Sequence, residues 1–458
     1  MTQEEIVQKI LEANQLRQEG ETAAAVQALE AVLEAEPNQP EALHMLGVIW
    51  MEQEKWAFAY QICRRVASIN PNHAQTWNNL GKCCDELQRF EEAIMCFERA
   101  IEIDPGNPKG YGNAACALLN MGKYEEALAM ATEGVAVDPD NRASHTNLGF
   151  ARLGLHDWQG WSDYEWSLGG KGRREIVYGD EERWDGTKGL IVAVHPEQGV
   201  GDEIMFASVF EDAAKDCEQL IVECHPKLEG LFRRSFPGIR VEGTRKDLVC
   251  DWLDEVTPDA RSSMANLCRF YRTDASQFPG TPYLKADPER RLQWRALFDS
   301  YKKPVIGIAL TGGTKATAKH RRTLKFEDFL PLFRSIDAEW VSLEYRDRSD
   351  ELREFCRKYD IVIHEFPWAT KSDDYDDTAA LLAELDEVIG IHTAALHCAA
   401  ALGQSVTALI PEVPQWRYVK NEMPWYRSMR LFRQQSKEPW QQTVQRLADE
   451  RKALRAAA

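Results

Sequence analysis

Four prolines recur at a constant interval in the first third of the chain. They are Pro37, Pro71, Pro105 and Pro139, and each follows the previous one by 34 residues. Proline lacks a backbone N–H and clashes with the turn before it, so a helix is expected to end ahead of each one. A sustained interval of this length is typical of solenoids built from a repeated pair of helices. The interval therefore predicts an α-helical solenoid over this part of the chain.

Small residues keep the same interval and identify the kind of repeat. Alanine recurs as Ala25, Ala59, Ala93 and Ala127, and a second small position is held by Gly47, Gly81, Ala115 and Gly149. Small side chains at these positions allow the two helices of a repeat to approach closely. The pattern resembles the tetratricopeptide repeat, with four full repeats and a degenerate fifth in which Trp161 replaces the alanine. We place this repeat domain at residues 1–170.

Asn79, Asn113 and Asn147 share the interval and are expected on the first helix of successive repeats. Asparagine is a poor helix former, so its recurrence requires an explanation. One explanation is that the three amides bind the backbone of an extended protein or peptide, because each amide both donates and accepts hydrogen bonds. The other is that they pack neighbouring helices together. Both explanations stay open at this point.

Composition narrows the classes of partner. The formal net charge of −18 argues against non-specific binding of nucleic acid and against docking on an anionic membrane. No apolar run approaches the ~20 residues that span a bilayer. The acidic first residues contain no apolar signal core, and the 11 cysteines include no Cys-x-x-Cys pair. These features predict a cytoplasmic protein with reduced thiols.

The rest of the chain predicts an α/β architecture. Glycines and cations at 169–174 suggest a flexible linker. Apolar runs that alternate with helical patterns then indicate strands at 190–194, 220–224, 239–241, 304–310, 340–343, 361–363, 387–391 and 406–410. Such alternation implies parallel sheets with right-handed crossovers. We divide this part into domains at 184–300 and 301–458.

Three stretches that follow strands suit a nucleotide. Gly199 and Gly201 form a loop before a helix start, where backbone can approach a ligand closely. Lys315 and Arg322 belong to the stretch 311–322, whose glycines and cations suit a diphosphate, unless it is only a solvated basic turn. The last stretch begins a helix, where backbone N–H groups meet phosphates, and comprises His392, Thr393, Ala394, Ala395 and, one turn on, His397.

Asp374 and Asp376 form an Asp-x-Asp pattern that some sugar transferases use to bind a metal. A capping role at the start of the helix predicted over 376–382 explains the pattern better. No cluster of histidines or cysteines offers another metal site. We therefore expect no metal.

In this order the motifs look like those of a GT-B glycosyltransferase, most similar to the heptosyltransferase-like family 9. The matching stretches are 199–204, 311–322 and 392–403. The combination with tetratricopeptide repeats also resembles O-GlcNAc transferases and bacterial protein glycosyltransferases. The resemblance implies two Rossmann-like domains, with the nucleotide sugar on the second and the acceptor over the first. His392 departs from the aspartate usual in family 9 and is closer to the O-GlcNAc transferase pattern.

The resemblance also implies a mechanism. Asp202 would be the general base that takes the proton from the acceptor hydroxyl. Thr393, the N–H groups of Ala394 and Ala395, and Lys315 or Arg322 would stabilise the leaving diphosphate without a metal. The expected activity is inverting transfer from a nucleotide-sugar co-substrate, with no other cofactor, to a protein that the repeats recruit. Three alternatives remain: Asp202 as a helix N-cap, a catalytically inactive repeat adaptor, and a glycan or lipid-linked acceptor.

Overall fold

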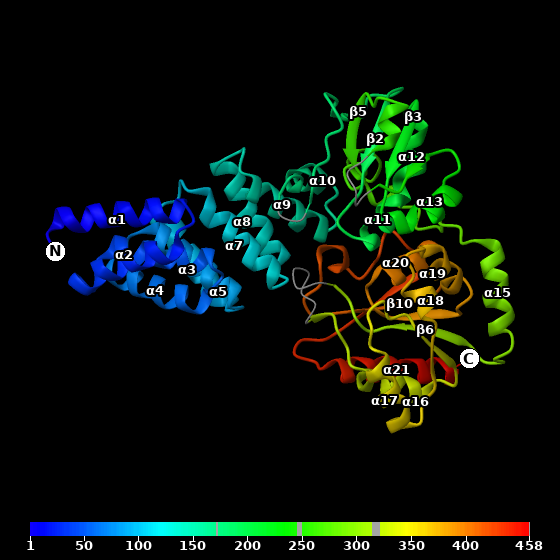
Figure 1. Cartoon of the computed structure of the whole chain (residues 1–458). Helices are drawn as coiled ribbons and strands as arrows, with labels where there is room; N and C mark the ends of the chain where they lie inside the picture. The colour runs from blue at the N-terminus through cyan, green and yellow to red at the C-terminus, as the bar shows by residue number, and fades with distance from the viewer. Residues whose placement is uncertain (171–172, 245–249, 314–320, 458) are drawn as a thin grey trace. The chain divides into compact units, whose positions relative to one another are not determined.

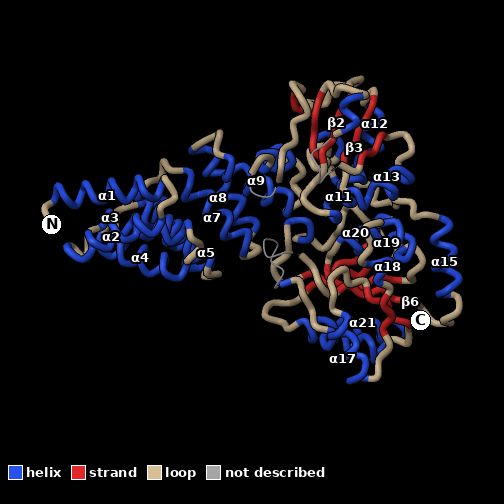
Figure 2. Tube along the Cα trace, viewed as in Figure 1, coloured by secondary structure: helices blue, strands red, loops and turns tan. Residues whose placement is uncertain are grey.

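The computed structural model describes residues 1–170, 173–244, 250–313 and 321–457. The chain divides into two compact units, Met1–Leu155 and His156–Ala458. The first unit is entirely helical outside its turns, and the second combines two sheets with surrounding helices (Figures 1 and 2). Among the described residues, no helix is long and apolar enough to cross a membrane.

The first unit consists of successive helix pairs. The first helices of the repeats are α1 (Gln3–Gln18), α3 (Pro40–Glu52), α5 (Ala74–Glu86), α7 (Pro108–Asn120) and α9 (Arg142–Gly154). The second helices are α2 (Thr22–Ala35), α4 (Trp56–Ile69), α6 (Phe90–Ile103) and α8 (Tyr124–Val137). Each second helix ends two residues before one of the four recurring prolines, which confirms the prediction made from their interval.

The small positions lie where the two helices of a repeat meet. Ala25, Ala59, Ala93 and Ala127 are fully buried. A Cβ atom on Gly81 would lie 2.6 Å from the ring of Phe97, so any larger residue would push α5 away from α6. The interval of 34 residues therefore records a packing requirement that every repeat shares.

The first sheet of the second unit is fully parallel. Its strands are β1 (Glu182–Arg183), β2 (Ile191–His195), β3 (Gln219–Glu223), β4 (Arg240–Glu242) and β5 (Ala260–Ser263), in the spatial order β1-β5-β2-β3-β4. Its helices include α11 (Val200–Phe206), α12 (Phe210–Asp216), α13 (Glu229–Ser235) and α14 (Cys268–Tyr271). From β2 the chain continues to β3 and β4 on one side, and it then crosses to β5 on the other side of β2. The strand order therefore reverses between β2 and β5.

The second sheet is also parallel and has six strands in the order β11-β10-β9-β6-β7-β8. They are β6 (Val305–Ala309), β7 (Glu339–Ser342), β8 (Ile363–Glu365), β9 (Glu387–Ile391), β10 (Val406–Ile410) and β11 (Met429–Arg433). Counted from β6, this is the order 3-2-1-4-5-6 of doubly wound nucleotide-binding folds. The order reverses between β6 and β9, and ligands of such sheets bind outside the strand ends at that point.

Helices cover the second sheet and connect it to the first. They are α15 (Pro288–Phe298), α16 (Leu330–Ser335), α17 (Ser349–Tyr359), α18 (Pro367–Thr370), α19 (Tyr375–Leu382), α20 (Ala394–Ala401) and α21 (Trp440–Ala457). Val444 and Leu447 of α21 belong to the core cluster that contains Ile308 of β6 and Trp340 of β7. The terminal helix is therefore part of the second sheet's core.

The sequence predicted the strands with continuous apolar runs and missed three with polar residues. They are the two-residue edge strand β1, the strand β5, whose residues are Ala-Arg-Ser-Ser, and the edge strand β11, which contains two arginines. The strand predicted at 406–410, the last one predicted along the chain, is therefore followed by another. An edge strand is covered on one side only, so its sequence need not be continuously apolar.

The segment predicted as a linker is built into the second unit where it is described. Arg173 is only 3% exposed. The degenerate fifth repeat retains a short helix, α10 (Gly160–Tyr164), which also belongs to this unit. Trp161 of α10 is buried, and its Nε1 donates a hydrogen bond to the carbonyl of Arg272 at 2.9 Å. The tryptophan that breaks the repeat pattern therefore packs into the α/β unit.

The two sheets of the second unit meet through their helices. A Cβ atom on Gly201 of α11 would lie 3.3 Å from Cα of Ala394 at the start of α20. Arg234 of α13 makes two hydrogen bonds of 2.7 Å with Asp376 of α19. Since α11 follows β2 and α20 follows β9, these contacts bring the carboxyl ends of the two sheets to one place.

Candidate functional site

The start of α20 contains a buried hydroxyl that makes no hydrogen bond. Thr393 is the N-cap residue, with extended backbone at φ −129° and ψ 175°, yet its side chain does not cap the helix. Its Oγ1 is buried and has no partner among the described residues. A buried polar group without a partner costs about 1–3 kcal/mol. The first-turn N–H groups of Ala394 and Ala395 lie beside it, so the position suits a ligand that accepts hydrogen bonds.

His392, which precedes it, is buried and neutral. Its side chain is 2% exposed, and neither ring nitrogen makes a hydrogen bond to a described residue. Its ring centroid lies 4.4 Å from that of Tyr418. Burial, assisted by the charge of Arg322, lowers the pKa of His392 well below its ordinary value. The ring therefore offers an uncharged donor and acceptor next to Thr393.

Two arginines supply positive charge. Nη2 of Arg322 donates to the carbonyl of His392 at 2.8 Å, and burial lowers the pKa of this guanidinium. Arg417, in the short helix η9 (Trp416–Tyr418), forms an ion pair with Asp202, with 2.6 Å between Nη2 and Oδ1. Among the described residues, Arg322 and Arg417 thus place two guanidinium groups close to His392.

Asp202 does not cap its helix. The N-cap residue of α11 is Gly199, and no side chain caps that end. The Asp202 carboxylate is instead 29% exposed and faces Arg417 across the junction of the two sheets. The N-cap explanation is therefore wrong, and the role of general base stays a prediction.

The two glycines of the loop behave differently. The closest heavy atom to a Cβ on Gly201 belongs to Ala394, so its small size serves the contact between α11 and α20. A Cβ on Gly199 would approach only the carboxylate of Asp202, at 3.5 Å. Contact of either glycine with a donor stays a prediction.

His397 is held on both sides of its ring. Its Nδ1 lies 3.1 Å from the hydroxyl of Tyr426, and its Nε2 lies 2.8 Å from that of Tyr418. Burial lowers its pKa to about 3. The Tyr426 hydroxyl also lies 3.3 Å from that of Tyr283, which donates to the carbonyl of Ile204 in α11. His397 thus positions α20 through a tyrosine network.

The basic stretch after β6 is described only at its ends. The N–H of Gly312 donates to the carbonyl of Arg322 at 2.8 Å, and Thr311 pairs with Thr323. Glu344 accepts hydrogen bonds from the N–H groups of Leu310 and Thr311 at 2.6 and 3.0 Å. These contacts fix Arg322 beside β6. Lys315 lies outside the described residues.

The recurring asparagines mainly join successive repeats. Nδ2 of Asn113 donates to Oδ1 of Asn78 at 3.0 Å, and Nδ2 of Asn147 donates to the carbonyl of Gly112 at 2.8 Å. Both bonds run to the preceding first helix, as the packing explanation requires. Asn79 differs, because its buried Nδ2 makes no hydrogen bond among the described residues while Oδ1 accepts one from Gln75. Peptide binding by the three amides stays a prediction.

The Asp-x-Asp pattern has the capping role. Asp374 accepts a hydrogen bond from the N–H of Asp376 at 3.0 Å and is the N-cap of α19. It also pairs with Arg290 at 2.7 Å. In the described parts of the chain, no group of three or more histidines, cysteines, aspartates and glutamates is placed to hold a metal ion.

Sequence reasoning missed the residues that follow β10. Arg417, Tyr418 and Tyr426 all come from the connection between β10 and β11, which has no helical or strand periodicity. The available signal was the density of aromatic residues there, since Trp416 and Trp425 lie in the same stretch.

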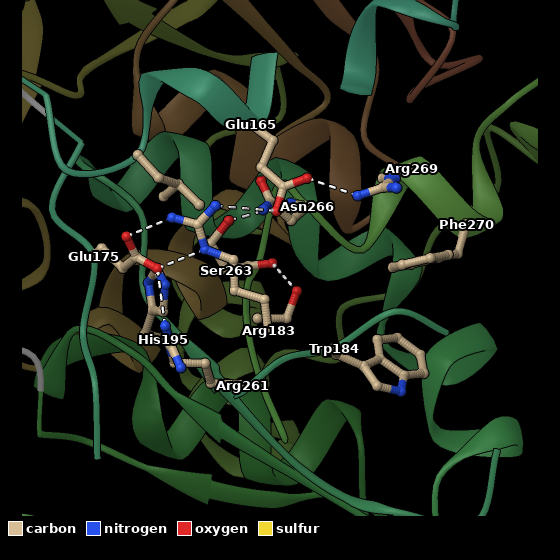
Figure 3. A pocket seen from close by; sticks show the side chains of 12 residues that line it. Glu165, Glu175, Arg183, Trp184, His195, Arg261, Ser263, Asn266, Arg269 and Phe270 are labelled. Carbon is tan, nitrogen blue, oxygen red and sulfur yellow. Dashed lines mark hydrogen bonds and ion pairs between the residues drawn. The ribbon is translucent and has the colours of Figure 1, made fainter. Parts of the chain in front are cut away.

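A second group of charges lies at the carboxyl ends of β2 and β5, around a small pocket (Figure 3). Arg183 makes two hydrogen bonds of 2.7 Å with Glu175, and Arg269 pairs with Glu165 at 2.7 Å. His195 also lines this pocket, and burial lowers its pKa. The charges of Arg183 and Arg269 are thus paired within this group.

Family comparisons identify the repeats. Two tetratricopeptide-repeat models match residues 96–129 and 113–157, and a model described as "Anaphase-promoting complex, cyclosome, subunit 3" matches residues 18–100. Together with the helix pairs, these matches show that the first unit contains tetratricopeptide repeats, which typically bind protein partners. Of the residues that these models match, only 156 and 157 lie in the second unit.

A curated relative and several solved structures are also similar. Protein FlbA of Caulobacter vibrioides is 27% identical over 282 residues, covering 58% of this chain and 47% of FlbA. The chain thus spans about half the length of that relative. The crystal structure of MamA protein is 20% identical at a TM-score of 0.34, covering 39% of this chain and 100% of that one. The crystal structure of YrrB, described as a TPR protein with an unusual peptide-binding site, is 19% identical at a TM-score of 0.31. The similarity covers 34% of this chain and 80% of YrrB.

Proposed function

We propose that the second unit is a GT-B glycosyltransferase that transfers a sugar from a nucleotide-sugar donor, by an inverting and metal-independent reaction, to a hydroxyl of a protein recruited by the repeats. The observation that carries the proposal is the start of α20, where Thr393 has a buried hydroxyl without a partner among the described residues and where Arg322 and Arg417 lie nearby. It lies at the strand-order reversal of the second sheet, which is where doubly wound folds bind nucleotides. The parallel sheet that faces it supports a two-domain GT-B arrangement.

The diphosphate of the donor is the group that this site fits best. It carries negative charge and many acceptor oxygens, and it gains charge as the glycosidic bond to it breaks. Arg322, Arg417 and the first-turn N–H groups of α20 are donors already fixed in a dehydrated place, where electrostatic stabilisation is strongest. Thr393 would donate its hydroxyl to a phosphate oxygen.

The acceptor reacts on the side of the first sheet. Asp202 takes the proton of the acceptor hydroxyl as that oxygen bonds to the anomeric carbon. The bond from that carbon to the diphosphate oxygen breaks, and the diphosphate leaves with the electron pair. One displacement at carbon inverts its configuration.

Thermal unfolding with nucleoside diphosphates and nucleotide sugars, without added metal, tests the donor site. A ligand at a hundredfold excess over its dissociation constant stabilises the folded state by about 2.7 kcal/mol. We expect one nucleotide to raise the unfolding temperature selectively, and Asp202→Asn to keep that shift while losing transfer. A chain that no nucleotide stabilises would instead be the inactive adaptor, and an Asp202→Asn variant with most of its turnover would exclude the base.

Acceptor capture by the full chain tests the role of the repeats. The full chain is required because a fragment ending at residue 170 would separate Trp161 from the unit that buries it. We expect Asn79→Ala to weaken capture of the protein acceptor, since its Nδ2 is not used between helices. Asn120→Ala, which removes a bond to Asp85, is the control for inter-helix packing. Equal capture by all three chains would show that the Asn79 amide does not bind the acceptor, and capture by none of them would favour a glycan or lipid-linked acceptor.

A further inference from the structure

The ion pair between Arg417 and Asp202 joins the two parts of the proposed active site. Arg417 follows β10 of the second sheet, and Asp202 lies in α11 after β2 of the first. The guanidinium forms an ion pair with the carboxylate that the proposed function uses as a base. In this arrangement Arg417 competes with an acceptor hydroxyl for Oδ1 of Asp202.

Arg417 has hydrogen-bonding capacity that Asp202 does not use. A guanidinium has five N–H donors. Its Nε is buried and makes no hydrogen bond among the described residues. The group lies over the ring of Trp416 at 4.7 Å from its centroid, a contact that fixes the side chain's plane without using any donor. Only 11% of this side chain is exposed, so little of the missing hydrogen bonding can come from water.

The position of Arg417 brings it close to the start of α20. The next residue, Tyr418, contacts the ring of His392 and bonds Nε2 of His397 at 2.8 Å. Through Tyr418, η9 therefore contacts the start of α20, where the diphosphate would bind. The Asp202 carboxylate and a phosphate bound at the start of α20 are therefore two alternative anionic partners for Arg417.

We propose that Arg417 exchanges partners when the donor binds. Without donor it holds Asp202; with donor it binds the diphosphate and releases the Asp202 carboxylate toward the acceptor. The inference rests on the proposed function and makes Arg417 a diphosphate-binding residue that also positions the base. It follows that the donor binds before the acceptor becomes reactive, which protects the enzyme from deprotonating an acceptor when no sugar is present.

A double-mutant cycle with inorganic pyrophosphate as the probe tests the exchange. The chains are the wild type, Asp202→Asn, Arg417→Ala and the double variant, and calorimetric titration gives each dissociation constant. We expect Asp202→Asn to bind pyrophosphate about fivefold more tightly, because Arg417 no longer has a competing carboxylate. Arg417→Ala should bind at least tenfold more weakly, and the double variant should bind as weakly as Arg417→Ala.

Asp376→Asn is the matched control, because it breaks the other ion pair described above between the two sheets' helices at 2.7 Å and lies away from the start of α20. It should leave the pyrophosphate dissociation constant unchanged. If the wild type binds pyrophosphate and both Asp202→Asn and Arg417→Ala bind it with the same affinity, Arg417 has only a structural role. The proposed exchange of partners is then wrong. If neither the wild type nor any variant binds pyrophosphate or a nucleoside diphosphate, the proposed donor site itself fails.

Arg417→Lys separates charge from shape. Lysine keeps the positive charge but lacks the planar fork that binds two acceptors at once. We expect it to recover part of the pyrophosphate affinity and, in the transfer reaction, to raise KM for the donor more than it lowers kcat. If Arg417 served only to stabilise the fold, Arg417→Lys would change the unfolding temperature without raising KM for the donor relative to kcat.

Discussion

The two sheets of the second unit reverse their strand order at equivalent points, yet the polar groups there are satisfied very differently. Beside β2 and β5, Arg173 donates to both carboxylate oxygens of Glu197, at 3.1 and 2.8 Å, and to Ser263 at 2.9 Å. Glu197 also accepts from the N–H of Ala265. Beside β6 and β9, Thr393 and His392 together have three buried polar atoms without a partner among the described residues, whereas β5 has one, Nε of Arg261. Strand order permits a ligand at both points, and the larger number of unsatisfied atoms favours the second.

The same comparison indicates which charged residues stabilise the fold and which are expected to bind a ligand. The first point contains a buried ion pair whose remaining donors are used by neighbouring side chains and carbonyls. Removing one partner of such a pair leaves an uncompensated buried charge, which is strongly destabilising. At the second point the ion pair of Arg417 and Asp202 lies near buried polar atoms of His392 and Thr393 that have no hydrogen-bond partner among the described residues, and we expect a bound molecule to provide one.

Removal of Arg173 should have the largest effect on stability. We expect Arg173→Ala to lower the free energy of unfolding of the second unit by about 3–5 kcal/mol, because Glu197 stays buried without its partner. Chemical denaturation measures this effect. Arg174→Ala is the matched control, since that neighbouring side chain is exposed, and it should change stability by less than about 0.5 kcal/mol. Similar stabilities for the two variants would contradict the structural role of the pair.

Acid should destabilise the second point through its histidines. The pKa of His397 is about 3 in the folded chain, below the ~6.5 expected when it is unfolded. Between these values the unfolded chain binds more protons, so the free energy of unfolding decreases as pH falls. From pH 6.5 to 5 this amounts to about 2 kcal/mol for His397. His392 acts in the same direction.

Unfolding of His397→Gln across this pH range measures that contribution. Glutamine can keep one hydrogen bond to a tyrosine, so the fold of the variant can be compared with that of the wild type. Between pH 6.5 and 5 its free energy of unfolding should decrease by about 2 kcal/mol less than that of the wild type. Bound pyrophosphate should also reduce the acid sensitivity of the wild type, because a nearby anion favours a protonated His392. An unchanged pH slope in His397→Gln would show that burial does not keep this ring neutral.

How far the sequence predicts this molecule depends on whether a feature repeats or stands alone. The interval of the prolines gave the helix ends of the first unit, and apolar runs such as 387–391 gave β9 at its observed bounds. The polar strand β5 was missed, because its position beside β2 is fixed by tertiary pairing and not by an apolar pattern. Arg173 was placed in a flexible linker for the same reason, since only the fold shows that Glu197 lies opposite.

The candidate site shows the same limit. Asp202, Arg322, His392 and Thr393 follow predicted strands or open predicted helices, so local patterns reveal them. Arg417 follows no such pattern, and it is identified only by its distance to Asp202 across the two sheets. Residues that complete a site from an irregular connection therefore require the structure.

Removing one hydroxyl at each of the two strand-order reversals should have the smallest effects and compares the two points directly. Ser263→Ala, at the end of β5, removes an acceptor used by Arg173 and by the N–H of Asn266, so it should destabilise the chain by about 1–3 kcal/mol. Thr393→Val, after β9, removes a hydroxyl that has no partner among the described residues, so stability should stay equal or rise by up to about 1 kcal/mol. Pyrophosphate affinity should respond in the opposite way, falling about fivefold in Thr393→Val only, as expected for one hydrogen bond of about 1 kcal/mol. If both variants lose stability and neither loses affinity, the hydroxyl of Thr393 is structural, and the contrast between the two strand-order reversals would not reflect ligand binding.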